Sequence, residues 1–165
     1  MIASAPVLID AEQARLISGG VGMSAASCRP GALPNMARCT GCRISPDRRN
    51  VTLILAATPG AALLDDVRRS GLIAAVFSQP STHHTLQLKG TDARIVPLEP
   101  DDAPLVRRYV DAFVAELAAF GYPELLARAF LASPPDDLAA VQFTISAAFS
   151  QTPGPQAGAP LAAVR

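Results

Sequence analysis

Hydrophobic and polar positions along the chain follow two different periods, and the changes between them predict where strands and helices lie. Alternation or short apolar runs predict strands at 21–28, 35–44, 51–57, 72–77, 84–98 and 138–149. A spacing of three to four residues predicts helices at 10–18, 61–70, 102–120 and 124–131. Glycine and proline signals at 19–20, 29–31, 71 and 134–135 separate these elements. The run VTLILAA at 51–57 is apolar enough to be buried on both faces.

The order of these elements predicts a mainly β, α+β fold. Short strands joined by tight turns favour antiparallel pairing, and six of them are enough to close a small barrel. A parallel βαβ sheet is disfavoured, because one helix alone interrupts the first five strands. We therefore predict a single domain over 1–165, a six-stranded antiparallel split β-barrel with flanking helices. Its parts are an N-terminal helix (1–20), barrel strands (21–98), helices (102–131), a last strand (138–149) and a Pro/Gly-rich tail (150–165), which is either free or an arm that clasps a partner.

Composition narrows the class of protein. The 14 basic and 14 acidic residues balance, and tryptophan is absent, which argues against a nucleic-acid partner. No apolar run approaches the ~20 residues of a membrane span, and nothing at the start marks the chain for secretion. Three cysteines, Cys28, Cys39 and Cys42, are an odd set that suits reduced thiols in the cytoplasm. We therefore expect a cytoplasmic protein without a membrane partner.

The stretch 21–98 resembles the pyridoxamine 5′-phosphate oxidase-like, FMN-binding split-barrel superfamily. The best-matching run is AAVFSQPSTHHTLQLKG, at 74–90, in which an apolar strand enters a turn and a polar strand ends in glycine. The order of strands and the short helix among them is also the same. The resemblance implies an FMN-binding, flavin-dependent oxidoreductase with a small-molecule substrate. It also implies a homodimer in which each flavin lies between two subunits.

The resemblance assigns a set of cofactor-binding residues. In the family, an arginine on the second strand and a basic residue five positions on reach the flavin and its phosphate, and Arg38 and Arg43 hold that spacing. Strand geometry places two such residues on opposite faces unless a bulge intervenes, which Gly41 allows; if one alone reaches the site, we prefer Arg43. Thr58 matches a family Thr or Ser at the end of the third strand. The segment 78–85 is expected to line the flavin ring through Ser78, Gln79, Ser81, Thr82, His84 and Thr85.

Departures from the family pattern keep other functions open. Members that bind FMN firmly carry Ser-Arg-Lys where this chain has Gly60-Ala61-Ala62, so an anion there would depend on backbone N–H groups of the helix N-terminus. Substrate residues of the true oxidase are not recognisable, so vitamin B6 oxidase activity is not expected. The alternative is a split-barrel protein that binds haem or a deazaflavin, with His83 or His84 as a possible haem ligand or proton donor. A third hypothesis is a structural or regulatory dimer without a ligand.

Other site chemistries find little support in the sequence. Cys39 and Cys42 form one C-x-x-C with no second pair, and they lie in a predicted strand rather than at a helix start. We interpret them as structural or incidental thiols and predict no metal site. The sequence has no paired carboxylates, Ser–His–Asp signature or Gly-rich phosphate loop. It therefore identifies no catalytic residue.

Overall fold

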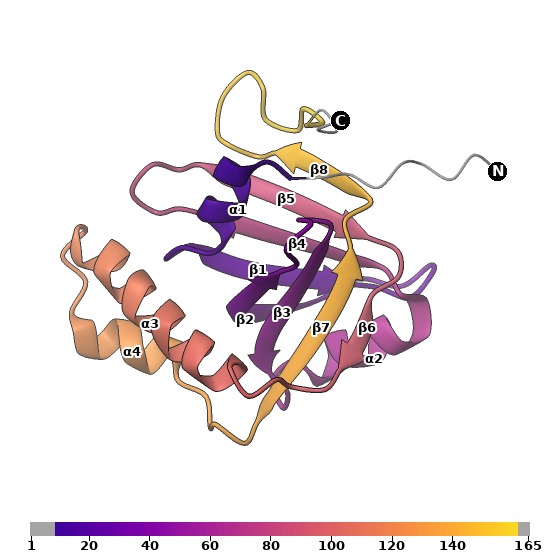
Figure 1. The fold of residues 1–165 in the computed structure, drawn as a ribbon, viewed down its shortest axis with the longest axis horizontal. Coiled ribbons are helices and arrows are strands. Elements are labelled where there is room, and N and C mark those ends of the chain that lie inside the picture. The colour runs from indigo at the N-terminus through magenta and orange to yellow at the C-terminus, as the bar shows by residue number, and fades with distance from the viewer. Residues whose placement is uncertain (1–8, 162–165) are drawn as a thin grey trace.

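The computed structural model describes residues 9–161, which form four helices and eight strands (Figure 1). All strand pairs are antiparallel, in the order β6-β7-β3-β2-β1-β4-β5-β8. Among the described residues no helix has the length and apolar character needed to cross a bilayer. The elements are α1 (Ala11–Ile17), β1 (Gly22–Ser27), β2 (Asn35–Ile44), β3 (Asn50–Ala56), α2 (Ala61–Ser70), β4 (Ile73–Ser78), β5 (Thr85–Gly90), β6 (Arg94–Val96), α3 (Asp102–Ala118), α4 (Glu124–Leu131), β7 (Leu138–Thr144) and β8 (Ala147–Ser150).

The α+β class and the antiparallel sheet are confirmed, but the prediction of a six-stranded barrel is wrong. The sheet has eight strands and is open, with β6 and β8 at its edges. The two extra strands arise because the predicted strands 84–98 and 138–149 each bend in the middle. At the first bend Gly90 lies so close to Phe143 that an added Cβ would be 2.5 Å from its ring. Asp92 then accepts hydrogen bonds from the backbone and hydroxyl of Thr144, which takes residues 91–93 out of the ladder.

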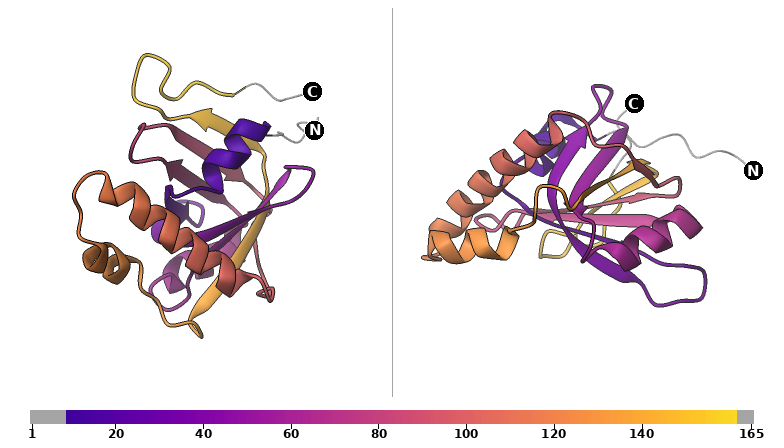
Figure 2. Two further views of the ribbon diagram at one scale, coloured as in Figure 1. Left: turned by 60° about the vertical axis from the view of Figure 1, so that its left-hand side comes forward. Right: turned by 90° about the horizontal axis from the view of Figure 1, so that it is seen from below.

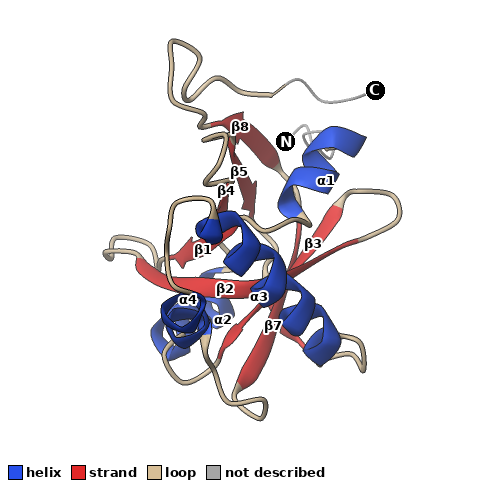
Figure 3. Ribbon diagram, turned by 90° about the vertical axis from the view of Figure 1, so that its left-hand side faces the viewer, coloured by secondary structure: helices blue, strands red, loops and turns tan. Residues whose placement is uncertain are grey.

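The bends curl the sheet without disturbing the register of the two long segments. On one side of the bends Leu86 of β5 pairs with Ser150 of β8, and on the other side Val96 of β6 pairs with Ala140 of β7. Both pairs have the register of one continuous antiparallel ladder. The curled sheet encloses the hydrophobic core (Figures 1 and 3). Side chains that point into it from successive strands include Met23, Leu53, Leu55, Phe77, Leu88 and Phe143.

Strand β3 is buried on both faces, as its sequence predicts. Leu53 and Leu55 belong to the core, whereas Ile54 points to the other face of the sheet. There the closest atoms to an added Cβ at Gly41 would be those of Ile54 and of Leu105 on α3. Helices α3 and α4 pack together and α3 lies across β2 (Figures 2 and 3). The outer face of β2 is therefore covered by helix along part of its length.

A β-bulge interrupts β2 at Thr40. Cys39 pairs with Leu55 and Gly41 with Ile54, so one extra residue lies between them. The bulge reverses the alternation that follows it, which places Arg38 and Arg43 on the same outer face of the sheet. Cys39 and Cys42 accordingly both point into the core. The sequence-based expectation that a bulge near Gly41 would bring the two arginines to one face is confirmed.

The described part of the tail folds back along β8 of its own chain. Leu161 N donates to Ala148 O, and Gly158 N donates to Ser150 O at 2.7 Å. Phe149 and Pro160 form an isolated bridge. The tail is irregular, as predicted, and these hydrogen bonds anchor it along the edge of its own sheet.

Candidate functional site

The residues nominated for cofactor binding that line a cavity are found in two separate cavities. Cavity one, of about 480 Å³, lies between α1, the start of β5 and the tail, and its lining includes Gln79, His84 and Thr85. Cavity two, of about 260 Å³, lies between β2, the start of α2 and the end of α4, and its lining includes Arg38. They share no lining residue. The structure therefore does not bring the nominated residues into a single cavity of one chain.

Cavity one is lined by both apolar and polar residues. The large apolar ones are Leu16, Val21, Leu86 and Leu161. Polar groups of its lining come from three segments: Asp10, Glu12, Gln13 and Arg15 at α1; Gln79, His84 and Thr85 near β5; and Ser150 and Thr152 in the tail. Such a surface suits a planar, partly apolar ligand, and its volume lies within the ~300–1,000 Å³ of small-molecule sites.

The loop that borders cavity one is held in place by Glu116 of α3. Its carboxylate accepts hydrogen bonds from the Gln79 side chain at 2.9 Å and from Ser81 N at 3.2 Å. Burial opposes ionisation of Glu116, but these hydrogen bonds outweigh it and lower its pKa. Thr82 completes the loop by donating to Gln79. At the tip, His83 has a left-handed backbone with φ of 60°.

Cavity two combines an arginine, a buried hydroxyl and a helix N-terminus. Arg38 is exposed, and among residues 9–161 it has no ion pair; its guanidinium lies 4.2 Å from the centre of the Phe130 ring of α4. Gly60 caps α2 without a side-chain hydrogen bond. Gly60 N and Ala61 N already donate to Ala56 O and Thr58 O, so the N–H groups of Ala62 and Leu63 are the ones at this helix start that are left to attract an anion.

The hydroxyl in cavity two belongs to Thr40, the bulge residue of β2. Thr40 is 5% exposed, and its Oγ1 has no hydrogen-bond partner among the described residues. A buried hydroxyl without a partner costs about 1–3 kcal/mol of desolvation. Because the oxygen itself is covered, a ligand atom reaches Thr40 Oγ1 only where neighbouring side chains move aside, and a hydrogen bond formed there would remove this cost.

Close packing explains why the first position of the family's charged cluster is glycine in this chain, whereas Ala61 and Ala62 are exposed and have no such constraint. A Cβ added at Gly60 would be 2.4 Å from Leu55 Cδ1 and 2.8 Å from Ala56 O. The turn from β3 into α2 is therefore too tight for any larger residue at this position.

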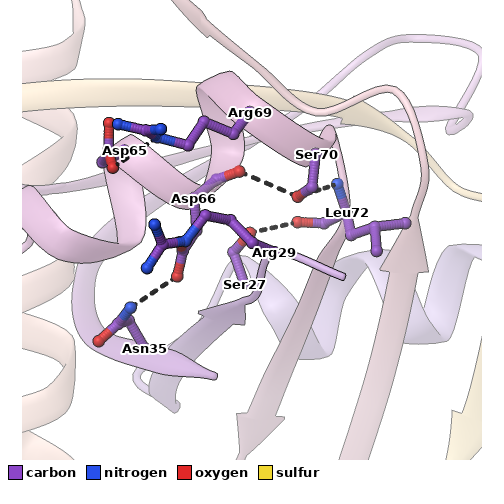
Figure 4. Close-up of polar contacts among 8 residues, drawn as sticks. All are labelled: Ser27, Arg29, Asn35, Asp65, Asp66, Arg69, Ser70 and Leu72. Atoms are coloured by element: carbon purple, nitrogen blue, oxygen red, sulfur yellow. Dashed lines mark hydrogen bonds and ion pairs between the residues drawn. The ribbon is translucent and has the colours of Figure 1, made fainter. Parts of the chain in front are cut away.

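Helix α2 is fixed against β1 and β2 by the buried carboxylate of Asp66 (Figure 4). Asn35 Nδ2 donates to it at 2.6 Å, and Arg29 Nε lies 3.1 Å away. At the end of the helix the Ser27 hydroxyl donates to Leu72 O at 2.6 Å. These contacts hold the second half of α2 against the start of β2 and the end of β1.

The Arg43 side chain forms ion pairs with two carboxylates of its own chain. Its Nε lies 2.7 Å from Asp102 Oδ1 at the start of α3, and its Nη1 contacts Glu99. The Asp102 side chain is 2% exposed and also accepts from Glu99 N at 2.7 Å. Two carboxylates already match the single charge of Arg43, which joins α3 to β2. Arg43 lines neither cavity one nor cavity two.

The remaining nominated residues lie in turns or at strand ends, and their side chains form hydrogen bonds within the chain. Thr58 donates to Asp137 through both its amide and its hydroxyl, which ties the β3–α2 turn to the segment before β7. Ser78 and Thr85 share a hydrogen bond of 2.8 Å across β4 and β5. Ser81 and Thr82 are exposed in the loop bound to Glu116. Gln79, His84 and Thr85 are thus the nominated residues of this segment that reach a cavity.

The two cysteines of the C-x-x-C pair are packed in the hydrophobic core. Cys39 is fully buried and Cys42 is 7% exposed. Burial raises the pKa of Cys39 to about 12 and raises that of Cys42 further. Both thiols therefore stay protonated near neutral pH, which disfavours metal binding and thiol exchange. Residues 9–161 contain no group of three or more His, Cys, Asp or Glu side chains that suits a metal ion.

Sequence reasoning missed three residues of cavity two: Met36, Thr40 and Phe130. Met36 and Phe130 are large apolar residues that are 70% and 58% exposed and border the same cavity. They are 94 positions apart in sequence, and no local pattern pairs them. The Gly41 signal identified the bulge, but not the burial of the Thr40 hydroxyl beside it.

Comparisons with known proteins bear on the fold. No protein-family model matches the chain, and no curated protein is a match in sequence. HupZ of Group A Streptococcus is similar in structure, with a TM-score of 0.55 and 16% identity over 92% of this chain and 100% of that one. A protein assigned as a pyridoxamine 5′-phosphate oxidase from Lactobacillus delbrueckii has a TM-score of 0.52 and 15% identity over 86% of this chain and 93% of that one. These neighbours agree with the predicted resemblance at the level of structure: the chain shares its α+β fold with HupZ and with this protein assigned as a pyridoxamine 5′-phosphate oxidase.

Proposed function

We propose that the chain binds a flavin-type cofactor, with FMN as the simplest form, and that cavity two holds its phosphate. The observation that carries this proposal is Arg38, which lines cavity two and has no ion pair among residues 9–161, beside the Thr40 hydroxyl and the α2 N-terminus. A phosphate accepts hydrogen bonds from all three kinds of donor. The proposal keeps the cofactor predicted from the family resemblance, but makes Arg38 rather than Arg43 the phosphate ligand.

The size and surface of cavity two fit one end of such a cofactor. Its 260 Å³ lie just below the range of complete ligand sites, so the phosphate and part of the ribityl chain would be enclosed. The exposed Met36 and Phe130 at its border offer an apolar surface for the ring. Once bound, FMN supplies hydride-transfer chemistry, while the protein contributes orientation and charge.

A homodimer would reconcile the two cavities. Gln79, His84 and Thr85 were predicted to line the ring, yet they lie in a cavity that shares no residue with cavity two. If both sets contact one flavin, they come from different subunits. A C₂ dimer would then form two equal sites, each with a phosphate end and a ring end.

FMN titration of the purified chain tests the proposal. We expect binding that shifts the flavin spectrum near ~450 nm and that weakens at least tenfold in Arg38→Ala, because a hydrogen bond to a charged group contributes about 1.5–3 kcal/mol. Arg68→Ala is the matched control, since Arg68 is exposed on α2 and lines neither cavity. Absence of FMN binding to the wild-type chain would refute the proposal.

A haem- or deazaflavin-binding protein is the second candidate, favoured by the position of His84. This histidine borders the larger cavity, whose lining includes four large apolar residues. A planar ligand there would have an imidazole at its edge, and haem would give a Soret band that is lost in His84→Ala. His83→Ala is the control, because His83 does not line the cavity.

The reaction proposed is oxidoreduction of a small-molecule substrate by the bound flavin, without vitamin B6 oxidase activity. No residue is assigned to catalysis, because the chemistry would reside in the cofactor. The proposal also includes a cytoplasmic location, supported by three free cysteines, Cys28, Cys39 and Cys42. A substrate screen becomes useful once a flavin-loaded protein is in hand.

A further inference from the structure

Helix α4 is held to the rest of the molecule by little apolar packing. Of its four large apolar side chains, Leu131 alone is buried, whereas Leu125, Leu126 and Phe130 are 82%, 57% and 58% exposed. Helix α2 buries four of its ten residues, and α4 buries two of its eight. Figure 2 shows α4 at the periphery of the molecule, beside α3. Moving α4 away from its neighbours would therefore expose little apolar surface.

One polar contact joins α4 to another part of the chain. Among residues 9–161, the hydrogen bonds and ion pairs that link 123–133 to other segments consist of Arg128 Nη1 with Asp111 of α3, at 2.8 Å. The two side chains are 43% and 64% exposed, and ion pairs of this kind contribute little to stability. Helices with few buried contacts are the elements that open locally while the rest of a protein stays folded.

Cavities lie on two sides of the wall at the end of α4. Cavity three, of about 290 Å³, lies between α3 and α4. Leu131, Ala132 and Ser133 line both this cavity and cavity two. A segment between two cavities lacks the dispersion contacts that close packing would supply on those sides. The packing around the end of α4 therefore restrains it weakly.

The segments on either side of α4 are suited to a hinge movement. Before the helix, Gly121 has a left-handed backbone with φ of 78°, and no described atom lies within 4 Å of a Cβ added there. After the helix, the chain is fixed again at Asp137, which accepts a hydrogen bond of 2.8 Å from the Thr58 hydroxyl. Helix α4 can therefore turn about residues 119–123 and 132–136 while α3 and β7 stay in place.

The position of Thr40 connects this helix with access to cavity two. Thr40 Oγ1 is covered and has no hydrogen-bond partner in the described part of the chain, and residues 130–133 line the same cavity. The other lining residues belong to β2, to the end of β3 and to the turn before α2, and β2 and β3 are held by strand pairing. The wall formed by α4 is therefore the part of the cavity that moves most easily.

We infer that α4 is a gate of cavity two: it opens as a unit about its two connecting segments while the sheet stays folded, and the open state exposes Thr40. A ligand would enter in the open state and reach an oxygen that the closed state covers. This inference goes beyond the proposed function, because it concerns access to the cavity and does not depend on which ligand the cavity takes.

Thiol labelling of the ligand-free chain tests the gate. The Thr40→Cys variant is made in a Cys28→Ser background, which removes the partly exposed cysteine and leaves two that are buried in the core. We expect the new thiol to react with Ellman's reagent about tenfold faster than that of Thr52→Cys in the same background. Thr52 is the matched control, because it is 3% exposed where Thr40 is 5% exposed, lies on the neighbouring strand β3 and does not line cavity two.

A second substitution tests whether α4 is the element that moves. Arg128→Ala removes the ion pair with Asp111 and should raise the labelling rate of Thr40→Cys about two- to fivefold, without changing that of Thr52→Cys. Arg107→Ala is the control, because Arg107 is exposed on α3, lines the same cavity three and has no ion pair among residues 9–161. It should leave both rates unchanged.

Hydrogen exchange of the unsubstituted chain provides a readout that needs no new thiol. Amides of α4 should exchange about tenfold faster than those of α2, and equal protection of the two helices would overturn the inference. Equal labelling of Thr40→Cys and Thr52→Cys would also overturn it, as would a fast rate at Thr40→Cys that Arg128→Ala does not change. Because no ligand is present in these experiments, failure of FMN to bind would leave the gate standing, and failure of the gate would leave the proposed function standing.

Discussion

Two arginines five residues apart on the same face of β2 have opposite environments. Arg43 lies between Asp102 and Glu99, and its side chain is 22% exposed. Arg38 has no ion pair among the described residues and stacks on the exposed Phe130 ring. One charge is matched within the chain, and the other is left available beside a cavity.

This difference separates a structural arginine from a binding one. A guanidinium that already meets two carboxylates gains little from a phosphate, because the phosphate would have to displace them. A guanidinium that meets only a ring and solvent can take the full charge-assisted hydrogen bonds of an anion. Residue type and spacing treat Arg38 and Arg43 alike; the position of Asp102 distinguishes them.

The largest expected effect is the loss of stability in Arg43→Ala. Removing one partner of a buried ion pair leaves the Asp102 carboxylate buried and unmatched, which costs about 3–5 kcal/mol in fully buried pairs. Because Arg43 is partly exposed, we expect about 3 kcal/mol, measured by urea unfolding.

A second substitution identifies the source of that loss. Asp102→Asn in the Arg43→Ala background removes the unmatched charge, so the double variant should regain part of the stability. The effect of Asp102→Asn on the free energy of unfolding is measured in the wild type and in the Arg43→Ala variant. If the loss is the same in both, the two side chains do not interact, and the contrast between Arg43 and Arg38 fails.

The next effect concerns the carboxylate that positions α2. Asp66→Ala removes buried contacts with Asn35 and Arg29, and we expect a loss of about 2 kcal/mol. Asp65→Ala is the matched control, because Asp65 pairs with Arg69 on the surface of the same helix, where such pairs contribute about 0.3–0.5 kcal/mol. Equal losses in thermal unfolding would mean that Asp66 does not anchor α2.

Much of the fold could be predicted from sequence, because its signals are local. The segment 124–131 is helical over its whole predicted length, and VTLILAA forms the doubly buried β3. The number of strands could not be predicted, because the bends near Gly90 and Ile145 depend on contacts between distant segments. Gly90 leaves room for Phe143, and Ile145 N donates to Arg49 O.

The candidate site was predictable only in part. The family resemblance nominated Arg38 and the polar loop, and the glycine in β2 indicated where a bulge could lie. The choice of Arg43 over Arg38 was a prediction that we now replace by a proposal, because partners 56 and 59 positions away in the sequence hold Arg43. The Thr40 hydroxyl lacks a partner because of how β2, α2 and α4 assemble, which no single segment encodes.

A smaller effect, of opposite sign, is expected for Thr40→Val. Replacing an unpartnered buried hydroxyl by a methyl group relieves its desolvation, so the ligand-free protein should gain about 1 kcal/mol. Thr52→Val is the control: Thr52 is also buried on a strand, but its hydroxyl accepts from Gln142, so this variant should gain nothing. The same Thr40→Val variant should bind FMN more weakly, and a stabilised protein with unchanged affinity would separate the hydroxyl from the phosphate site.

The smallest expected change in the free energy of unfolding is that of Arg38→Ala. The stacking of Arg38 on Phe130 is exposed, and such a contact contributes about 0.5–1 kcal/mol. We expect Arg38→Ala to lower the free energy of unfolding by about 0.5 kcal/mol, and to have less effect when Phe130 is already leucine. A double-mutant cycle by urea unfolding measures this coupling. A cost near that of Arg43→Ala would mean that Arg38 is also committed to the fold, and cavity two would then lose the cation on which its phosphate site depends.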